Sequence, residues 1–152
     1  MRNAFIFIIA ITTISISCSS NKKNEKSPGL KLEGSWELLS AHHTEGDTSF
    51  YTDLTGKRMI KIINDSHFAF LNHDLNKGQD SVSTFVSGGG RYKLNGNAYF
   101  EELEFCNFRE WEGHEFNFTI EIRDDTLVQK GVEKIEELGV DRIITETYVR
   151  LK

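Results

Sequence analysis

The sequence predicts an all-β domain that folds as a single up-and-down antiparallel β-barrel of about eight strands. Short segments in which apolar and polar residues alternate follow one another along most of the chain, as in strands with one buried face. Tight turns rich in Asn, Asp and Gly separate these segments, and strands and helices do not alternate as they do in α/β folds. A sandwich of two sheets fits the same pattern, and the barrel is the architecture that we expect.

Alternation and turn residues locate the individual strands. A turn at 64–66 joins the first hairpin, and the pattern leaves open which side chains of 57–72 face the core. At the three glycines 88–90 we expect a bend or bulge rather than a phosphate-binding loop, because this run precedes a strand and not a helix. The expected strands are 36–41, 59–63, 67–71, 81–86, the two strands joined at Asn95-Gly96, 116–122, 126–130 and 143–151.

The clearest turn is Asn95-Gly96, since both residues tolerate the positive φ angles of a two-residue type I′ loop. With these two residues as the loop, Leu94 pairs with Asn97 and each cross-strand pair shares a face. A carboxylate, Glu101, then falls on the apolar face, where it needs a partner or a proton. The predicted interior face carries Tyr92, Leu94, Tyr99, Glu101, Leu103 and Phe105.

The last third of the chain continues the pattern. Apolar residues alternate through 116–122, a turn follows at Asp124-Asp125, and the return strand 126–130 places Gln129 on the apolar face. Helical spacing occurs only in 131–139, which we expect to form one or two helical turns or a loop. The closing strand is 143–151.

The first 17 residues resemble the signal peptide of a bacterial lipoprotein. Arg2 precedes a short apolar run that is too short to span a bilayer as a helix, and Ser17-Cys18 follows, although Ser15 stands where the lipobox usually has Leu. The resemblance implies a lipid on Cys18 and anchorage in the bacterial cell envelope, in the outer rather than the inner membrane, with the domain in the periplasm or at the cell surface. The alternative is a soluble secreted protein.

The composition of residues 18–152 distinguishes a tether from a folded domain and argues against one class of partner. Residues 18–31 are polar and lysine-rich and predict a flexible tether, whereas 32–152 have the length of one small domain. The net charge of −5 argues against nucleic acid as a partner, and we expect a monomer. The chain has two cysteines, so a lipid on Cys18 leaves Cys106 without an intrachain partner, and we expect Cys106 to be a small buried hydrophobe.

A motif near the start of the domain and an arginine near its end carry a family resemblance. Gly34-Ser35-Trp36 is similar to the Gly-x-Trp opening of lipocalins and their calycin relatives, and Arg150 to their late Arg. The whole of 32–152 resembles small bacterial lipocalin-like lipoproteins of uncharacterised function. This resemblance implies a barrel closed by Gly34, Trp36 and Arg150, with the guanidinium stacked on the indole. Thr52-Asp53 lies too early to match the second lipocalin motif.

Polar residues on the predicted interior faces are the candidates for ligand contacts. Glu146, Tyr148 and Arg150 share a parity on the closing strand, and we expect Arg150 or a ligand group to neutralise Glu101. No metal, cofactor or nucleophile motif accompanies them, and adjacent His42 and His43 suit a loop better than a metal site. The candidate ligand-binding residues are Tyr92, Tyr99, Glu101, Glu146, Tyr148 and Arg150.

These observations favour binding of a small, largely apolar or amphipathic ligand in the mouth of the barrel. The alternative is an interaction or inhibitor module of the envelope whose barrel is filled by side chains. A small barrel enzyme that uses the interior carboxylates is the third possibility, and an ion-paired cluster with a purely structural role explains those carboxylates without any ligand. A ligand-sized interior favours the first, and a filled interior with an exposed apolar patch favours the second.

Overall fold

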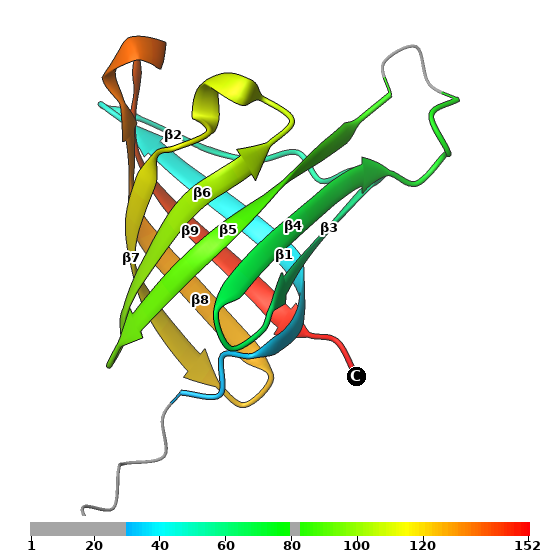
Figure 1. Ribbon diagram of the computed structural model, residues 1–152. Coiled ribbons are helices and arrows are strands. Elements are labelled where there is room, and N and C mark those ends of the chain that lie inside the picture. Colours follow the sequence, from blue (N-terminus) through cyan, green and yellow to red (C-terminus); the bar gives the residue numbers. More distant parts are fainter. Residues whose placement is uncertain (1–29, 80–82) are drawn as a thin grey trace, which may run out of the picture.

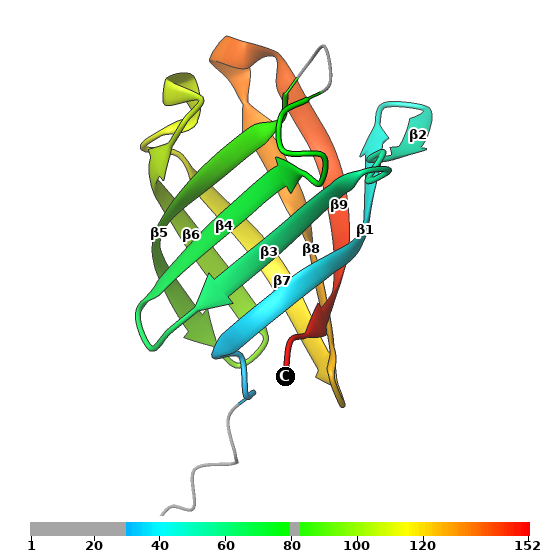
Figure 2. The ribbon, with the colours of Figure 1, turned by 90° about the vertical axis from the view of Figure 1, so that its right-hand side faces the viewer.

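The computed structural model describes residues 30–79 and 83–152, and these form one β-barrel (Figures 1 and 2). The expected signal peptide 1–17, Cys18 and most of the tether lie outside the described residues. Within these residues nine strands follow one another, and the two helices are single 3₁₀ turns. The elements are β1 Gly34–Glu45, β2 Thr48–Tyr51, β3 Lys57–Ile63, β4 His67–Asp74, β5 Phe85–Asn95, β6 Ala98–Cys106, η1 Arg109–Trp111, β7 Glu115–Arg123, β8 Thr126–Ile135, η2 Glu136–Leu138 and β9 Val140–Arg150.

The prediction of an all-β, antiparallel, up-and-down barrel is confirmed. The strands follow chain order around the sheet, and β1 pairs with both β3 and β9, which closes eight strands into a barrel. The ninth strand, β2, forms a short hairpin with the end of β1 and stands outside the closed ring (Figure 2). Closure leaves no free edge among the eight strands, so every one of them is paired on both sides.

The β5–β6 hairpin has the predicted facing with a different loop. Gly96 and Asn97 form the turn, and Asn95 pairs with Ala98 instead of standing in the loop. Moving the loop by one residue shifts the cross-strand pairs by two, so each residue keeps its face. Tyr99, Glu101 and Leu103 are accordingly buried in the interior.

The predicted interior position of Phe105 is wrong, because a β-bulge interrupts the pairing. Gly90 pairs with Leu103 and Gly89 with Phe105, so Glu104 is the extra residue of the bulge. Beyond it the parity reverses: Phe105 is 65% exposed, whereas Cys106 is buried. The bulge lies on β6, opposite the glycine run of β5 in which a bend or bulge is predicted.

Two local expectations are also wrong. Residues 131–135 continue β8 instead of forming a helix or loop, and only 136–138 make a 3₁₀ turn. His42 and His43 lie on β1 and not in a loop, because the β2 hairpin extends this strand beyond its predicted end. Of the two, His43 is buried and His42 is half-buried, so they do point to opposite sides.

One end of the barrel is closed by Trp36 beneath Arg150. The Trp36 side chain is fully buried, its indole nitrogen donates to the Leu32 carbonyl at 2.8 Å, and the guanidinium of Arg150 lies 4.0 Å from the ring centroid. Arg150 also donates to the Glu33 and Lys31 carbonyls, which ties the start of the domain to its last strand. The predicted stack is therefore present. Leu30 and the C-terminus lie at this same end (Figure 1).

The opposite end, called the mouth below, carries the longer connections. The β1–β2 hairpin, the connection from β4 to β5, and the two 3₁₀ turns all lie there (Figure 1). The closed end instead has short turns at 64–66, 96–97 and 124–125. The two ends of the barrel therefore differ in the length of their connections.

Candidate functional site

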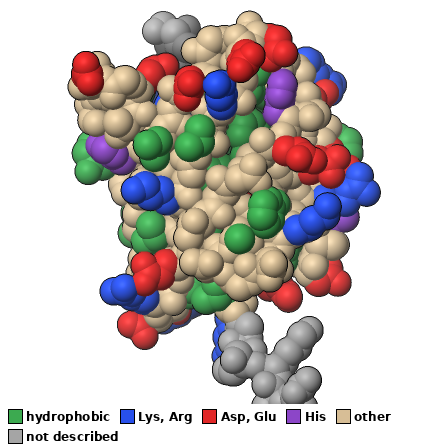
Figure 3. Space-filling model, turned by 90° about the vertical axis from the view of Figure 1, so that its left-hand side faces the viewer, with side chains coloured by type: hydrophobic (Ala, Val, Ile, Leu, Met, Phe, Trp, Pro, Cys, Tyr) green, Lys and Arg blue, Asp and Glu red, His purple; other side chains and the backbone are tan. Residues whose placement is uncertain are grey.

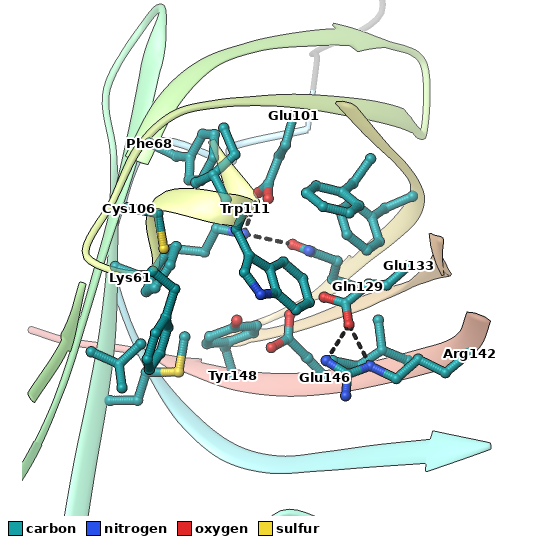
Figure 4. A pocket seen from close by; sticks show the side chains of 18 residues that line it. Lys61, Phe68, Glu101, Cys106, Trp111, Gln129, Glu133, Arg142, Glu146 and Tyr148 are labelled. Carbon is teal, nitrogen blue, oxygen red and sulfur yellow. Dashed lines mark hydrogen bonds and ion pairs between the residues drawn. The ribbon is translucent and has the colours of Figure 1, made fainter. Parts of the chain in front are cut away.

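A cavity of about 280 Å³ occupies the interior on the mouth side (Figure 4). This volume lies near the lower end of the range of about 300 to 1,000 Å³ typical of small-molecule sites. Strands β3, β4, β6, β7, β8 and β9 and the η1 segment all contribute lining side chains. The wall is mainly aromatic and aliphatic and includes Met59, Phe68, Phe70, Trp111, Phe116 and Phe118.

A buried polar cluster centred on Lys61 forms one side of the cavity. The Lys61 ammonium donates to the Glu101 carboxylate and, at 3.0 Å, to the Gln129 side-chain oxygen. The Lys61 and Glu101 side chains are 3% and 8% exposed, so water screens this ion pair very little. Two of the three donors of the ammonium are used in this way.

Aromatic rings surround the same ammonium. The Lys61 nitrogen lies 5.1 Å from the ring centroid of Phe68, 5.4 Å from that of Tyr99 and 5.9 Å from that of Tyr148. Ring faces are the negative ends of aromatic quadrupoles, so these rings attract the ammonium group.

A second carboxyl, Glu146, lines the cavity beside this cluster. Burial raises the pKa of Glu146 to about 7, because it penalises the charged form, while the nearby Lys61 ammonium opposes part of the rise. The Glu146 carboxyl therefore titrates near neutral pH.

Two tyrosine hydroxyls in the interior lack hydrogen-bond partners among the described residues. Tyr99 and Tyr148 are fully buried, and neither hydroxyl makes a hydrogen bond of ordinary length and angle. Burial, together with the nearby Glu101 and Glu146 carboxyls, raises the pKa of both hydroxyls well above the usual value, so both are protonated donors. The Tyr148 ring lines the cavity. The Tyr148 hydroxyl lies beside the Glu146 carboxyl, and its oxygen is available to accept a hydrogen bond from a ligand.

An ion pair and an indole lie toward the mouth. Arg142 donates to Glu133 from two nitrogens, each at 2.7 Å, and its guanidinium carbon lies 5.9 Å from the Trp111 ring centroid. Trp111 belongs to η1 and touches Phe116 of β7 through tilted rings 6.1 Å apart. The indole, shown in Figure 4, thus lies where it can report on occupancy of the cavity.

The structure brings together three of the six predicted ligand-binding residues. Glu101, Glu146 and Tyr148 line the cavity. Arg150 does not, because it lies at the closed end, so the expectation that it neutralises Glu101 is wrong and Lys61 does so instead.

The two other predicted residues do not line the cavity. Tyr92 donates to the Asn64 carbonyl at 2.8 Å, in a turn of the closed end, and is half-buried. Tyr99 lies between Tyr92 and Phe118, with ring centroids 5.3 Å and 6.5 Å away. Gly34 belongs to the closed end, where a Cβ atom would come within 2.6 Å of the Arg150 guanidinium.

Lys61 is the main functional candidate that the sequence did not reveal. A lysine flanked by isoleucines in a strand is ordinarily exposed. The hairpin pairing of Ile63 with Phe68 makes both residues interior, and the parity of β3 then carries Lys61 and Met59 to the same face. The available signal was the loop length of the β3–β4 hairpin, because it fixes the pairing and so places Lys61 on the same face as Phe68 and Phe70.

The outer surface shows no comparable feature on the face seen in Figure 3. Hydrophobic side chains there lie in small groups between charged side chains. Among residues 30–79 and 83–152, no helix is long and apolar enough to cross a membrane.

Comparison with known proteins leaves the geometry as the basis for function: no family model, curated protein or solved structure matches this chain.

Proposed function

We propose that the protein is a lipocalin-like binding protein that holds a small, largely apolar molecule in the cavity on the mouth side of the barrel. The observation that carries this proposal is the cavity itself, with its aromatic wall and the buried Tyr148 hydroxyl that finds no partner among the described residues. An apolar cleft with few convergent polar groups is the usual form of a small-molecule site. The interaction module with a filled barrel is less well supported, because the barrel is not filled.

We further propose that the chain is anchored to a bacterial membrane through a lipid on Cys18. The segment that carries Cys18 joins the domain at Leu30, at the closed end, and the mouth lies at the other end (Figure 1). The predicted tether would therefore attach to the barrel at the end opposite the mouth. Cys18→Ala should leave an uncut precursor or a soluble chain, and a Cys18→Ala chain that matures and stays in the membrane fraction would contradict the anchor.

Binding is tested with n-propylbenzene, a neutral apolar probe, and two neighbouring isoleucines of β9. Ile144 is 5% exposed and lines the cavity, whereas Ile143 is 43% exposed on the outside. Ile144→Trp should fill the cavity and abolish binding, and Ile143→Trp, the matched control, should bind as the wild type does. Leu103→Trp is a second blocking variant if Ile144→Trp unfolds.

The readout is the pair of indole N–H signals in a ¹⁵N–¹H NMR titration of the full chain. The sequence has two tryptophans, Trp111 at the cavity and Trp36 at the closed end. The probe should shift the Trp111 signal and leave the Trp36 signal in place. Unmoved signals at a saturating concentration of probe, or equal binding by Ile144→Trp, would refute the proposal. Native mass spectrometry of protein purified without delipidation would identify a ligand that copurifies.

A further inference from the structure

The charged side chains that line the cavity do not balance. They comprise two cations, Lys61 and Arg142, and three carboxylates. Lys61 is paired with Glu101 and Arg142 with Glu133, both through short contacts. Among the described residues, no lysine, arginine or histidine forms an ion pair with the remaining carboxylate, Glu146. With Glu146 ionised, the lining carries one negative charge more than it has cations to match.

Glu146 lies among groups that suit a positively charged head group. It shares the inward-facing side of β9 with Tyr148, whose buried hydroxyl lies beside it without a hydrogen bond of ordinary length and angle. Rings of Phe116, Phe118 and Trp111 line the same cavity. A carboxylate, a hydroxyl oxygen and aromatic faces are the groups that bind ammonium ions in proteins.

An anionic head group finds the opposite environment. Both cations of the lining already have carboxylate partners, so their charges are neutralised before a ligand carboxylate arrives. A ligand carboxylate bound here would add a fourth negative charge to a lining with two cations, which is unfavourable in a site that water screens little. The ligand carboxylate would also face Glu146, and juxtaposed like charges cost several kcal/mol.

We propose that the ligand of this cavity is a small organic cation, an amine with an aromatic or aliphatic body, whose ammonium group binds Glu146 while its body packs against the aromatic wall. The inference rests on the proposed binding function and specifies the class of ligand. It distinguishes an amine from a fatty acid or another carboxylate of the same size.

The affinity for such a cation depends on pH through Glu146. Its pKa of about 7 means that the carboxylate form is the minor species at pH 6 and the major species at pH 8. Alkyl ammonium groups stay charged throughout this range, since they titrate near about 10. The binding-competent fraction therefore rises about tenfold between pH 6 and pH 8, and the affinity rises with it.

Charged and polar groups surround Glu146 on the neighbouring strands. The β1 residue paired with Glu146 is Ala41, and the nearest buried titratable side chain on β1 is His43, whose pKa is lowered by burial and then by Arg142. The charged, titratable and polar side chains on the other strands at this site are Lys61 of β3, Glu101 of β6, Gln129 and Glu133 of β8, and Arg142 and Tyr148 of β9.

Three probes of similar size and different charge test the inference: 2-phenylethylamine, 3-phenylpropionate and n-propylbenzene. At pH 8 the amine should bind at least about tenfold more tightly than the acid. Glu146→Gln should weaken amine binding by about tenfold or more and leave n-propylbenzene binding unchanged. Glu137→Gln removes the same charge from an exposed position of η2 and is the matched control. The Trp111 indole signal again reports binding.

The outcomes separate this inference from the function on which it rests. If none of the three probes shifts the Trp111 signal, the binding function itself is refuted. If n-propylbenzene or the acid binds and the amine binds no better than the acid, the cavity binds ligands and the cation inference is overturned. Amine binding that is unchanged in Glu146→Gln, or that does not strengthen between pH 6 and pH 8, overturns it as well.

Discussion

Replacement of Lys61 by methionine should destabilise the barrel far more than the loss of an ordinary ion pair. Methionine keeps the length and apolar stem of lysine but leaves Glu101, whose side chain is 8% exposed, without its cation. Breaking a buried pair from one side costs about 3 to 5 kcal/mol. Gln129, which is 1% exposed, also loses the donor for its side-chain oxygen, and an unsatisfied buried acceptor costs about 1 to 3 kcal/mol.

The structure supplies a matched control for this loss on the same strand. Arg58 of β3 pairs with Glu37 of β1 at 2.8 Å, with side chains 46% and 31% exposed. Arg58→Met should cost only about 0 to 1 kcal/mol, because water screens an exposed pair. The contrast between the two substitutions measures the effect of burial with the same replacement residue.

Urea denaturation of the full chain, followed by circular dichroism at pH 7, gives the free energy of unfolding for each variant. The double variant Lys61→Met with Glu101→Leu removes both charges and should recover about 2 to 4 kcal/mol relative to Lys61→Met alone, since well-packed apolar residues often replace a buried ion pair without loss. A Lys61→Met loss below about 1 kcal/mol, or a double variant no more stable than the single one, would refute the reasoning. Glu101→Gln provides a milder variant if Lys61→Met does not fold.

Three further substitutions have expected outcomes that unfolding measurements can check. The pKa of Glu146 rises from 4.5 to about 7 on folding, so the free energy of unfolding of the wild type should fall by at most about 3 kcal/mol as the pH rises from 4.5 to 7. Glu146→Gln should remove this decrease with pH. A decrease of the same size in Glu146→Gln would contradict the burial of the carboxyl. Trp36→Ala should cost about 3 to 5 kcal/mol because the side chain is fully buried beneath Arg150, and a loss below about 1 kcal/mol would mean that this end is not closed by the indole. Gly90→Ala should cost about 1 to 3 kcal/mol or more, since its Cβ would lie 1.9 Å from the Glu102 carbonyl oxygen, and a neutral effect would show that the bulge can shift.

Period-two patterning was sufficient to predict an all-β fold and the buried face of most strands, because facing depends on parity alone, while a sandwich fitted the same pattern as the barrel. The hairpin around Gly96 illustrates this: the loop lies one residue later than predicted, yet Tyr99 and Glu101 remain in the interior. Parity fails where an extra residue enters a strand, as Phe105 shows beyond the bulge at Glu104. The glycine run predicted the bulge, but only the pairing in the folded barrel determines which strand carries the extra residue.

The site was less predictable than the fold because its residues depend on contacts between distant strands. Glu101 was recognised as a carboxylate that needs a partner, but its partner, Lys61, lies 40 residues away on β3. From its position in the closing strand, Arg150 was the more plausible partner for Glu101. In the structure its guanidinium instead stacks on Trp36 at the closed end. Depth along the barrel axis separates these two cations, and no local pattern in the sequence encodes depth.

The interior of this barrel is more polar than closure of the fold requires. Apolar side chains could replace the pair of Lys61 and Glu101 with little loss of stability, and such a core would contain no buried hydroxyl without a partner. The polar groups are also concentrated: Lys61, Glu101, Gln129, Glu146 and Tyr148 all line the same cavity, while the stack of Trp36 and Arg150 closes the other end. Departures from good core packing are expected where a protein needs a site rather than stability. The concentration of these unfavourable polar groups around one cavity supports the proposed ligand-binding function independently of the cavity volume.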